Sequence, residues 1–193
     1  MILAYHGIFT TYGTWLPNDP RGSFSTEMYN AELQALGAIQ YGRQAVQPAR
    51  PTLRKFWTAA APRLSRPPFF LNEQSRPSAA EAFGDVVARL SLQVPACAIM
   101  NDHMHILIMR SKYTIEYLVN QLKGSATAKL GLTQTPWARG RWKVFIDNDD
   151  ALQAAIAYVQ ANPVHAGLPA QRWDFVMRGD EGRTEEGRRA GDR

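Results

Sequence analysis

The sequence predicts an α+β fold built on an antiparallel sheet, and three observations support this prediction. Four short segments are rich in the β-branched and aromatic residues that favour strands. Three longer segments repeat apolar residues at helical spacing. The segments follow one another as strand, helix, strand, strand, helix, strand, with a further helix after them. This order predicts a ferredoxin-like βαββαβ core with an additional C-terminal helix.

The first predicted strand covers residues 2–12, whose sequence is ILAYHGIFTTY. Glycines and prolines then mark a turn-rich loop. A helix is expected within residues 26–45, and an irregular, proline-rich stretch over residues 46–77. No acidic residue occurs in 33–72, whereas six arginines and lysines do. The insertion formed by residues 17–75 is therefore basic, and both a DNA-contacting loop and a merely solvated loop fit this composition.

The middle of the chain predicts a helix and then a pair of strands. The helix covers residues 78–92, where Ser78 is a suitable N-cap and a glutamate stands three residues later. Pro95 separates this helix from the strand pair. Residues 96–101 and 103–110 are predicted to form the two strands, joined by a tight turn.

The last third predicts two helices with a strand between them. The first helix covers residues 114–130 and the strand covers residues 141–146. The acidic run at 147–150 is expected to open the final helix, because carboxylates are favourable at a helix N-terminus. Asn162-Pro163 is expected to end that helix, since the residue before a proline avoids helical geometry.

Composition limits the class of protein. The chain has 193 residues, of which 45% are hydrophobic, and a net charge of +5. Residues 1–177 are expected to form one domain, and the charged tail at 178–193 is expected to be disordered. The single cysteine, Cys97, excludes an internal disulfide and favours the cytoplasm. No apolar run is long enough to span a membrane. The basic balance favours a polyanionic partner.

A histidine pair is the strongest candidate for a functional site. His103 and His105 flank Met104 in a predicted strand, so their side chains point to the same face. Two adjacent imidazoles can bind a divalent metal, although they can also simply hydrogen-bond within a core. A histidine triad is excluded because residue 107 is leucine, and cysteine-pair zinc sites are excluded by the single cysteine.

The final helix offers a third ligand and a reactive group. Tyr158 and Asn162 are four residues apart, so they share a face and flank the apolar stripe of the helix. They can look into a cleft beside the sheet, or they can be a half-buried tyrosine and a capping asparagine. Tyr117, with Gln121 four residues later, is the competing pair. It lies opposite the apolar stripe of its helix, which favours Tyr158.

These residues resemble a known family. His103-Met104-His105 resembles the His-hydrophobic-His motif of the HUH endonucleases. The segment from Tyr158 to Leu168 resembles the Tyr-x-x-x-Asn-Pro-x-x-x-Gly-Leu signature of single-tyrosine transposases of the insertion-sequence 200/605 type, which include the REP-associated tyrosine transposases. Residues 5–13 resemble their first strand. The resemblance covers about residues 3–170, except for the insertion.

The resemblance implies a metal-dependent transposase that cleaves and rejoins single-stranded DNA at hairpins or palindromic repeats. Tyr158 is then the nucleophile and forms a 5′-phosphotyrosine intermediate. His103, His105 and Asn162 are the implied ligands of Mg²⁺ or Mn²⁺. The family includes monomers and homodimers, so the oligomeric state stays open. Such a protein is expected in the cytoplasm, at the nucleoid when bound to DNA.

Cations interleaved with aromatic side chains are the candidate DNA contacts, because bases stack on aromatic rings and phosphates attract cations. The expected contacts are Lys123, Lys129, Arg139, Arg141, Trp142, Lys143, Arg54 and Lys55. The alternative is that the tryptophans belong to the core and the cations are solvated. Two other functions remain open: a non-catalytic or domesticated DNA-binding protein on the same fold, and a zinc-dependent hydrolase that uses the histidine pair.

Overall fold

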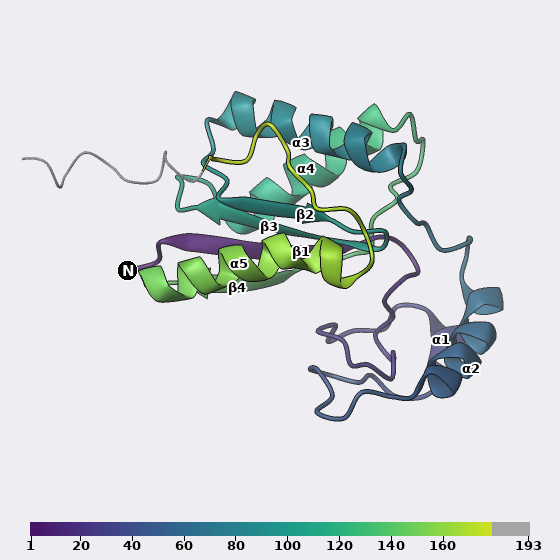
Figure 1. Cartoon of the computed structure of the whole chain (residues 1–193). Helices are drawn as coiled ribbons and strands as arrows, with labels where there is room; N and C mark the ends of the chain where they lie inside the picture. Colours follow the sequence, from purple (N-terminus) through teal and green to yellow (C-terminus); the bar gives the residue numbers. More distant parts are fainter. Residues whose placement is uncertain (179–193) are drawn as a thin grey trace, which may run out of the picture.

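The computed structural model describes residues 1–178, and its centre is a four-stranded antiparallel sheet. The strand order is β2-β3-β1-β4, so β3 and β1 are the inner strands. The strands are β1 (Ala4–Thr10), β2 (Ala96–Ile99), β3 (His103–Met109) and β4 (Trp142–Ile146). Helices α3 (Ser75–Leu90) and α4 (Ile115–Lys129) cover one face of the sheet, and α5 (Asp149–His165) covers the other (Figure 1). The predicted α+β class with a C-terminal helix is confirmed.

Alternation along β3 assigns its side chains to two separate cores. Met104, Ile106 and Ile108 are fully buried against α3 and α4. Leu107 lies on the opposite face and packs in a smaller cluster with Leu152 and Val159 of α5. Because both faces of β3 are covered, it is a central strand whose apolar residues run almost without interruption.

Side chains at the helix starts fix where α4 and α5 begin. The hydroxyl of Thr114 accepts a hydrogen bond from the backbone N–H of Tyr117, as expected for an N-cap. The side chain of Asn148 accepts from Ala151 N at 2.8 Å, and two aspartates follow in the first turn of α5. These carboxylates lie near the positive end of the helix dipole, as the sequence predicted.

The prediction that Asn162-Pro163 ends the last helix is wrong, because α5 continues to His165. Pro163 lacks an N–H, so the helix continues past it with one backbone hydrogen bond missing. The end is set instead by Gly167, whose φ of 76° is in the left-handed region. Gly167 N donates to Val164 O at 3.0 Å and Leu168 N donates to Pro163 O at 2.8 Å, which is a Schellman motif.

The start of α3 also differs from the prediction. The helix begins at Ser75 rather than Ser78, because the side chain of Asn72 accepts hydrogen bonds from Gln74 N at 3.0 Å and from Ser75 N at 2.8 Å. Ser78 therefore lies within the first turns of the helix and does not cap it.

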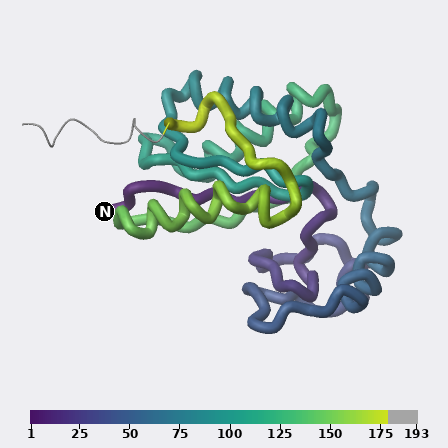
Figure 2. Tube along the Cα trace, in the orientation of Figure 1, coloured from purple at the N-terminus to yellow at the C-terminus, as the bar shows by residue number. Residues whose placement is uncertain are grey.

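The insertion is more ordered than its prolines suggest. The helix expected within 26–45 is reduced to the short α1 (Ala31–Gln34). The stretch expected to be irregular contains α2 (Arg50–Ala60) and the 3-10 turn η1 (Ala61–Arg63). Proline is compatible with both elements because it stands in their first turns. The insertion lies where β1 ends, on the α5 side of the sheet (Figure 2).

A buried ion pair organises the beginning of the insertion. Asp19 is fully buried and binds the Arg21 guanidinium through two hydrogen bonds of 2.9 and 2.7 Å. The guanidinium also lies 3.9 Å from the centre of the Trp15 ring. Two short contacts then join this segment to a later one, since Ser23 N donates to Gln40 O at 2.6 Å and Gly42 N donates to Ser23 O at 2.7 Å.

The two outer strands of the sheet differ in how far the rest of the chain covers them. The Gln171 side chain bonds to both the N–H and the C=O of Ile99 at 2.8 Å, so the segment after α5 covers the edge of β2. Three of the five residues of β4 are exposed. Within residues 1–178, no helix is both long and apolar enough to cross a membrane.

We expect Gly22→Ala to destabilise the protein clearly more than Gly42→Ala. Both glycines have left-handed φ values, 91° and 80°, so each substitution carries the strain of that region, about 1–2 kcal/mol. A Cβ at residue 22 would also lie 1.9 Å from Gly42 O, whereas a Cβ at residue 42 meets nothing within 4 Å. Free energies of unfolding from urea titrations measure the difference, and equal losses would contradict the close approach.

Candidate active site

Three histidines from the two inner strands meet on the α5 face of the sheet. In the antiparallel register His6 lies opposite Leu107, and Ile8 lies opposite His105. His6 is therefore on the same face as His103 and His105. The ring centroids are 4.9 Å apart for His103 and His105, and 5.2 Å apart for His6 and His105.

The hydrogen bonds of the cluster leave one nitrogen of each β3 histidine available. His103 Nδ1 lies 2.6 Å from Asp102 Oδ1, and His105 Nδ1 lies 3.0 Å from His6 Nε2. Within residues 1–178 neither Nε2 atom of this pair has a hydrogen-bond partner. A metal-bound histidine usually donates its second ring N–H to such an acceptor. The arrangement therefore fits a metal held by Nε2 of His103 and His105.

Backbone contacts hold Asp102 at the turn between β2 and β3. Its carbonyl oxygen accepts from Thr11 N at 2.8 Å, and from the hydroxyls of Thr11 and Thr14 at 3.1 Å each. Burial alone would raise the pKa of the Asp102 carboxyl, but the hydrogen bond and the charge of His103 lower it below its ordinary value. Asp102 thus remains a carboxylate, the form that accepts from an imidazole N–H.

Burial keeps the inner imidazoles neutral. It lowers the pKa of His6 to about 4. For His105, burial and then the neighbouring charges of His103 and His6 outweigh the opposing effect of Asp102 and lower the pKa to about 3. Neutral imidazole is the form that binds metals, so the cluster is ready to bind a cation at neutral pH.

Tyr158 reaches this cluster from α5. Its ring stands nearly perpendicular to that of His105, with centroids 5.6 Å apart, and its centroid lies 6.3 Å from that of His6. The Tyr158 side chain nevertheless remains 55% exposed. The phenol of Tyr158 thus lies beside the imidazoles and is accessible from solvent.

Asn162 lies one turn beyond Tyr158, and its side chain bonds within its own helix. Asn162 Nδ2 donates to Tyr158 O at 2.8 Å, which leaves the amide oxygen as an acceptor. In the described part of the chain, no three His, Cys, Asp or Glu side chains gather as a metal-binding group. A metal here would therefore need an amide, water or phosphate oxygen besides the two imidazoles. The role of Asn162 as third ligand stays a prediction.

The competing tyrosine lies elsewhere. Tyr117 is on α4, which covers the opposite face of the sheet, and its ring stacks on Tyr113 with centroids 5.2 Å apart. Gln121 accepts a hydrogen bond from Arg89 at 3.0 Å. The pair is thus separated from the histidines by the sheet, which favours Tyr158.

Several predicted DNA contacts already have partners within the protein. The Lys123 ammonium donates to Ala138 O at 2.9 Å and Gly140 O at 2.7 Å, and burial lowers its pKa to about 8. Lys129 pairs with Glu81 at 2.9 Å. Each of these cations would have to leave its partner to bind a phosphate.

The cations of the β4 region differ in how they are held. Lys143 and Arg141 both pair with Glu116, at 2.7 and 3.7 Å. Arg139 lies over the ring of Tyr29, 5.0 Å from its centroid. Trp142 begins β4 and is half-buried.

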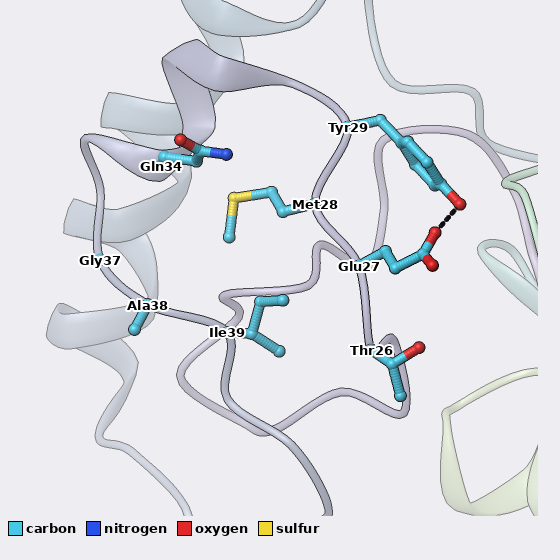
Figure 3. A pocket seen from close by; sticks show the side chains of 8 residues that line it. All are labelled: Thr26, Glu27, Met28, Tyr29, Gln34, Gly37, Ala38 and Ile39. Carbon is cyan, nitrogen blue, oxygen red and sulfur yellow. Dashed lines mark hydrogen bonds between the residues drawn. The ribbon is translucent and has the colours of Figure 1, made fainter.

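Arg54 and Lys55 are exposed on α2, within the insertion and apart from the sheet that carries the histidines. The insertion also contains a surface pocket, seen in Figure 3, to which the histidines and Tyr158 do not contribute. Its lining residues are Thr26, Glu27, Met28, Tyr29, Gln34, Gly37, Ala38 and Ile39. The Tyr29 hydroxyl donates there to the Glu27 carboxylate.

Two neighbours of the candidate ligands are not evident from sequence reasoning. His6 is isolated in the sequence, and only the register of β1 against β3 brings it to His105. Asp102 directly precedes His103, so its proximity is visible, but its hydrogen bond to Nδ1 depends on the turn geometry.

Comparison with known proteins gives the class and then the family. The fold is a four-stranded antiparallel sheet with helices on both faces, and three histidines and Tyr158 lie together on one of these faces. A family model described as "Transposase IS200 like" matches residues 65–159. The chain belongs to this family. The matched residues include His103, His105 and Tyr158, and they end before Asn162.

Solved structures also match this chain. A REP-associated tyrosine transposase bound to a REP hairpin matches with a TM-score of 0.50 and 13% identity, over 90% of this chain and 74% of the other, which supports the same fold. A candidate transposase from Deinococcus radiodurans R1 matches with a TM-score of 0.39 and 11% identity, over 82% and 89% of the chains. No curated protein sequence matches significantly.

Without metal, the stability of the protein should fall as the pH is lowered from 6.5 towards 4. Unfolded histidines titrate near pH 6.5, whereas folded His6 and His105 have pKa values of about 4 and about 3. The unfolded chain therefore takes up protons that the folded chain does not. Each imidazole removes up to about 1.4 kcal/mol of unfolding free energy per pH unit in this window.

Urea unfolding in EDTA at a series of pH values measures this dependence. His6→Gln should flatten it, because one of the two neutral, buried imidazoles is removed. Identical slopes for the wild type and the variant would show that His6 is not buried in the folded state.

Proposed function

We propose that this protein cleaves and rejoins single-stranded DNA with Tyr158 as the nucleophile. The observation that carries the proposal is the packing of the Tyr158 ring over His105 and His6, beside two imidazole nitrogens that have no protein partner in residues 1–178. Membership of the IS200-like transposase family supports the same chemistry.

In the cleavage step, Tyr158 Oη attacks the phosphorus of a phosphodiester. The bond from phosphorus to the 3′-oxygen of the preceding nucleotide breaks, and that oxygen leaves as a 3′-hydroxyl after taking up a proton. The phosphate remains joined to Tyr158 as a 5′-phosphotyrosine. Attack on this link by another 3′-hydroxyl reverses the step and releases the tyrosine. One phosphoester is exchanged for another, so no nucleotide cofactor is needed.

The residues around Tyr158 have separate tasks in this proposal. His103 and His105 hold a divalent cation through Nε2, and Asn162 contributes its amide oxygen. A bound Mg²⁺ or Mn²⁺ supplies the positive charge that polarises the scissile phosphate. Asp102 and His6 orient the two imidazoles through their Nδ1 atoms. The attack also requires that Tyr158 Oη lose its proton, and positive charge close to Oη would favour that loss.

The substrate that best fits the proposal is single-stranded DNA next to a hairpin or palindromic repeat. The solved relative with the TM-score of 0.50 is bound to a REP hairpin. Inverted repeats beside the coding sequence would name the specific substrate.

Tyr158→Phe should abolish the covalent DNA adduct, because the ring remains but the attacking oxygen is lost. Tyr117→Phe is the matched control and should retain it. Both are tested with a 3′-labelled single-stranded hairpin in Mn²⁺, because the fragment 3′ of the break stays joined to the tyrosine, and the adduct is seen by denaturing electrophoresis. An adduct formed by the Tyr158→Phe variant would refute the assignment of the nucleophile.

The same experiment separates the proposal from its alternatives. Hairpin binding by the wild type without any adduct would favour a non-catalytic DNA-binding protein. Hydrolysis without a tyrosine adduct would favour a metal-dependent hydrolase that uses the histidine pair.

Asp102→Asn should weaken binding of Mn²⁺ about 10-fold or more, because the charged acceptor that orients His103 is lost. Excess Mn²⁺ should restore adduct formation. Asp85→Asn makes the same change of charge on α3, on the other side of the sheet, and should bind Mn²⁺ like the wild type. Titrations followed by the paramagnetic resonance of free Mn²⁺ give the affinities, and equal values for both variants would argue against Asp102 as a positioning residue.

A further inference from the structure

The sheet face that carries the histidines is only partly covered. Helix α5 packs on Ala4 and Ile146 at one end of this face, and on Leu107 and Ala98 across it. Because side chains alternate along β1 and β4, this face carries other side chains of these strands in addition to His6. Of these, Val144 is 40% exposed, and Ile8 and Trp142 are half-buried.

Trp142 is directly in line with the candidate active site. It pairs with Ile8 on β1, and Ile8 pairs with His105 on β3. Paired residues of antiparallel strands lie on the same face, and neighbouring strands are about 4.8 Å apart. The Cα atoms of Trp142 and His105 are therefore about 10 Å apart across the sheet. The groups next to a phosphate held at the histidines would lie near this indole.

The indole is already half of a stacked pair. Phe24, from the insertion, lies almost parallel to Trp142, with ring centroids 3.7 Å apart and an interplanar angle of 24°. Tyr41 meets Phe24 edge-on at 6.2 Å. Phe24 is 43% exposed and Tyr41 is 62% exposed, so this aromatic stack is open to solvent. Exposed aromatic rings in a parallel stack are costly to leave in water and present a flat surface for another ring.

The surrounding charge favours an anionic partner over an apolar one. The segment that supplies Tyr41 has no acidic residue from Leu33 to Asn72, and the exposed Arg43 follows Tyr41 closely. On the other side, Arg139 precedes Trp142 and lies over Tyr29. Flat aromatic rings flanked by cations bind single-stranded nucleic acid through base stacking and phosphate contacts.

We propose that the Phe24–Trp142 pair is a stacking subsite for one unpaired base of the DNA strand that passes the histidine cluster. The base extends the existing stack, and its backbone continues towards the phosphate beside Tyr158. This rests on the proposed function for the identity of the strand. Phe24 and Trp142 are then substrate-positioning residues that join the insertion to the active site.

The test uses binding, so that it does not depend on cleavage. The protein is the full chain carrying Tyr158→Phe, in EDTA. The probe is a DNA hairpin with a single-stranded thymidine flank, together with a second probe whose flank is abasic. Thymidine is suitable because base stacking on aromatic side chains tolerates any base. Fluorescence anisotropy gives the dissociation constants.

Trp142→Ala and Phe24→Ala should each weaken binding of the thymidine probe about 5- to 100-fold, the range for loss of one stacked base. The protein with both aromatic residues intact should bind the abasic probe as weakly as the two variants bind the thymidine probe. Neither substitution should weaken binding of the abasic probe further. Trp142→Phe should restore most of the binding. Tyr117→Ala removes an exposed aromatic side chain on the other side of the sheet and should bind both probes like its parent.

Equal affinity for the thymidine and abasic probes, or no binding of either, would overturn the subsite. A second copy of the chain, paired at the edge of β4, is the other possible occupant of this surface. Sedimentation compares the mass of Trp142→Ala with that of its parent. A change of mass, together with equal affinities for the thymidine and abasic probes, would assign the surface to self-association. An adduct formed by the wild type without a stacking effect refutes the subsite alone. A stacking effect without any adduct refutes the proposed function alone.

Discussion

The antiparallel pairing of β1 with β3 is the constraint on which the candidate site depends. These strands are the inner pair of the sheet, and their register places His6 diagonally across from His105. A shift of one residue would turn His103 and His105 towards α3 and α4, and would place Met104 and Ile106 on the α5 face. The large apolar core on the α3 and α4 side therefore fixes the face that carries the histidines, because a one-residue shift would bury imidazoles there and remove Met104 and Ile106 from it.

The same strand thus serves stability and chemistry on its two faces. Met104, Ile106 and Ile108 supply apolar burial, while His103 and His105 alternate with them at no cost to that core. The α5 face then needs partners for the Nδ1 atoms of His103 and His105, and Asp102 and His6 provide them. Leaving either nitrogen unpaired would cost about 1–3 kcal/mol. The hydrogen bonds that stabilise the imidazoles are therefore also those that direct Nε2 outwards.

Helix α5 brings Tyr158 to this surface, and the way the helix ends explains much of the sequence signature. Val159 packs into the sheet directly after Tyr158, so the position of the phenol follows from burial of its neighbour. Gly167 reverses the chain in a conformation that favours glycine, and Leu168 returns to the same apolar cluster. The Asn-Pro and Gly-Leu parts of the segment thus bracket the last turn, although the proline stands inside the helix rather than beyond it.

The strongly periodic elements of the fold could be predicted from the sequence, because their apolar residues match one period along their whole length. The strands around His105 and the helix with Ile115 and Leu118 are examples. The insertion could not, because its order comes from contacts between residues distant in the sequence, such as the hydrogen bond from Ser23 N to Gln40 O and a small apolar cluster that joins Leu16, Leu33 and Ala60. For the site, spacing alone placed His103 with His105 and Tyr158 with Asn162. That the histidine pair and Tyr158 lie close together, and that His6 lies beside His105, could be seen only from the register and packing of the sheet.

The contact between the insertion and β4 gives a physical reason for the order of the insertion. An outer strand with exposed residues is open to pairing with other chains unless something covers or twists it. Phe24 covers one aromatic side chain of that strand, and the buried Asp19–Arg21 pair together with Trp15 keeps the preceding segment in place. The contact thereby ties a long connection to the sheet at Trp142, which is separated from His105 by Ile8 of β1. If single-stranded DNA is the substrate, as proposed, an ordered connection at that position would limit the directions from which the strand can reach Tyr158, so the insertion would contribute to substrate geometry without contributing a metal ligand.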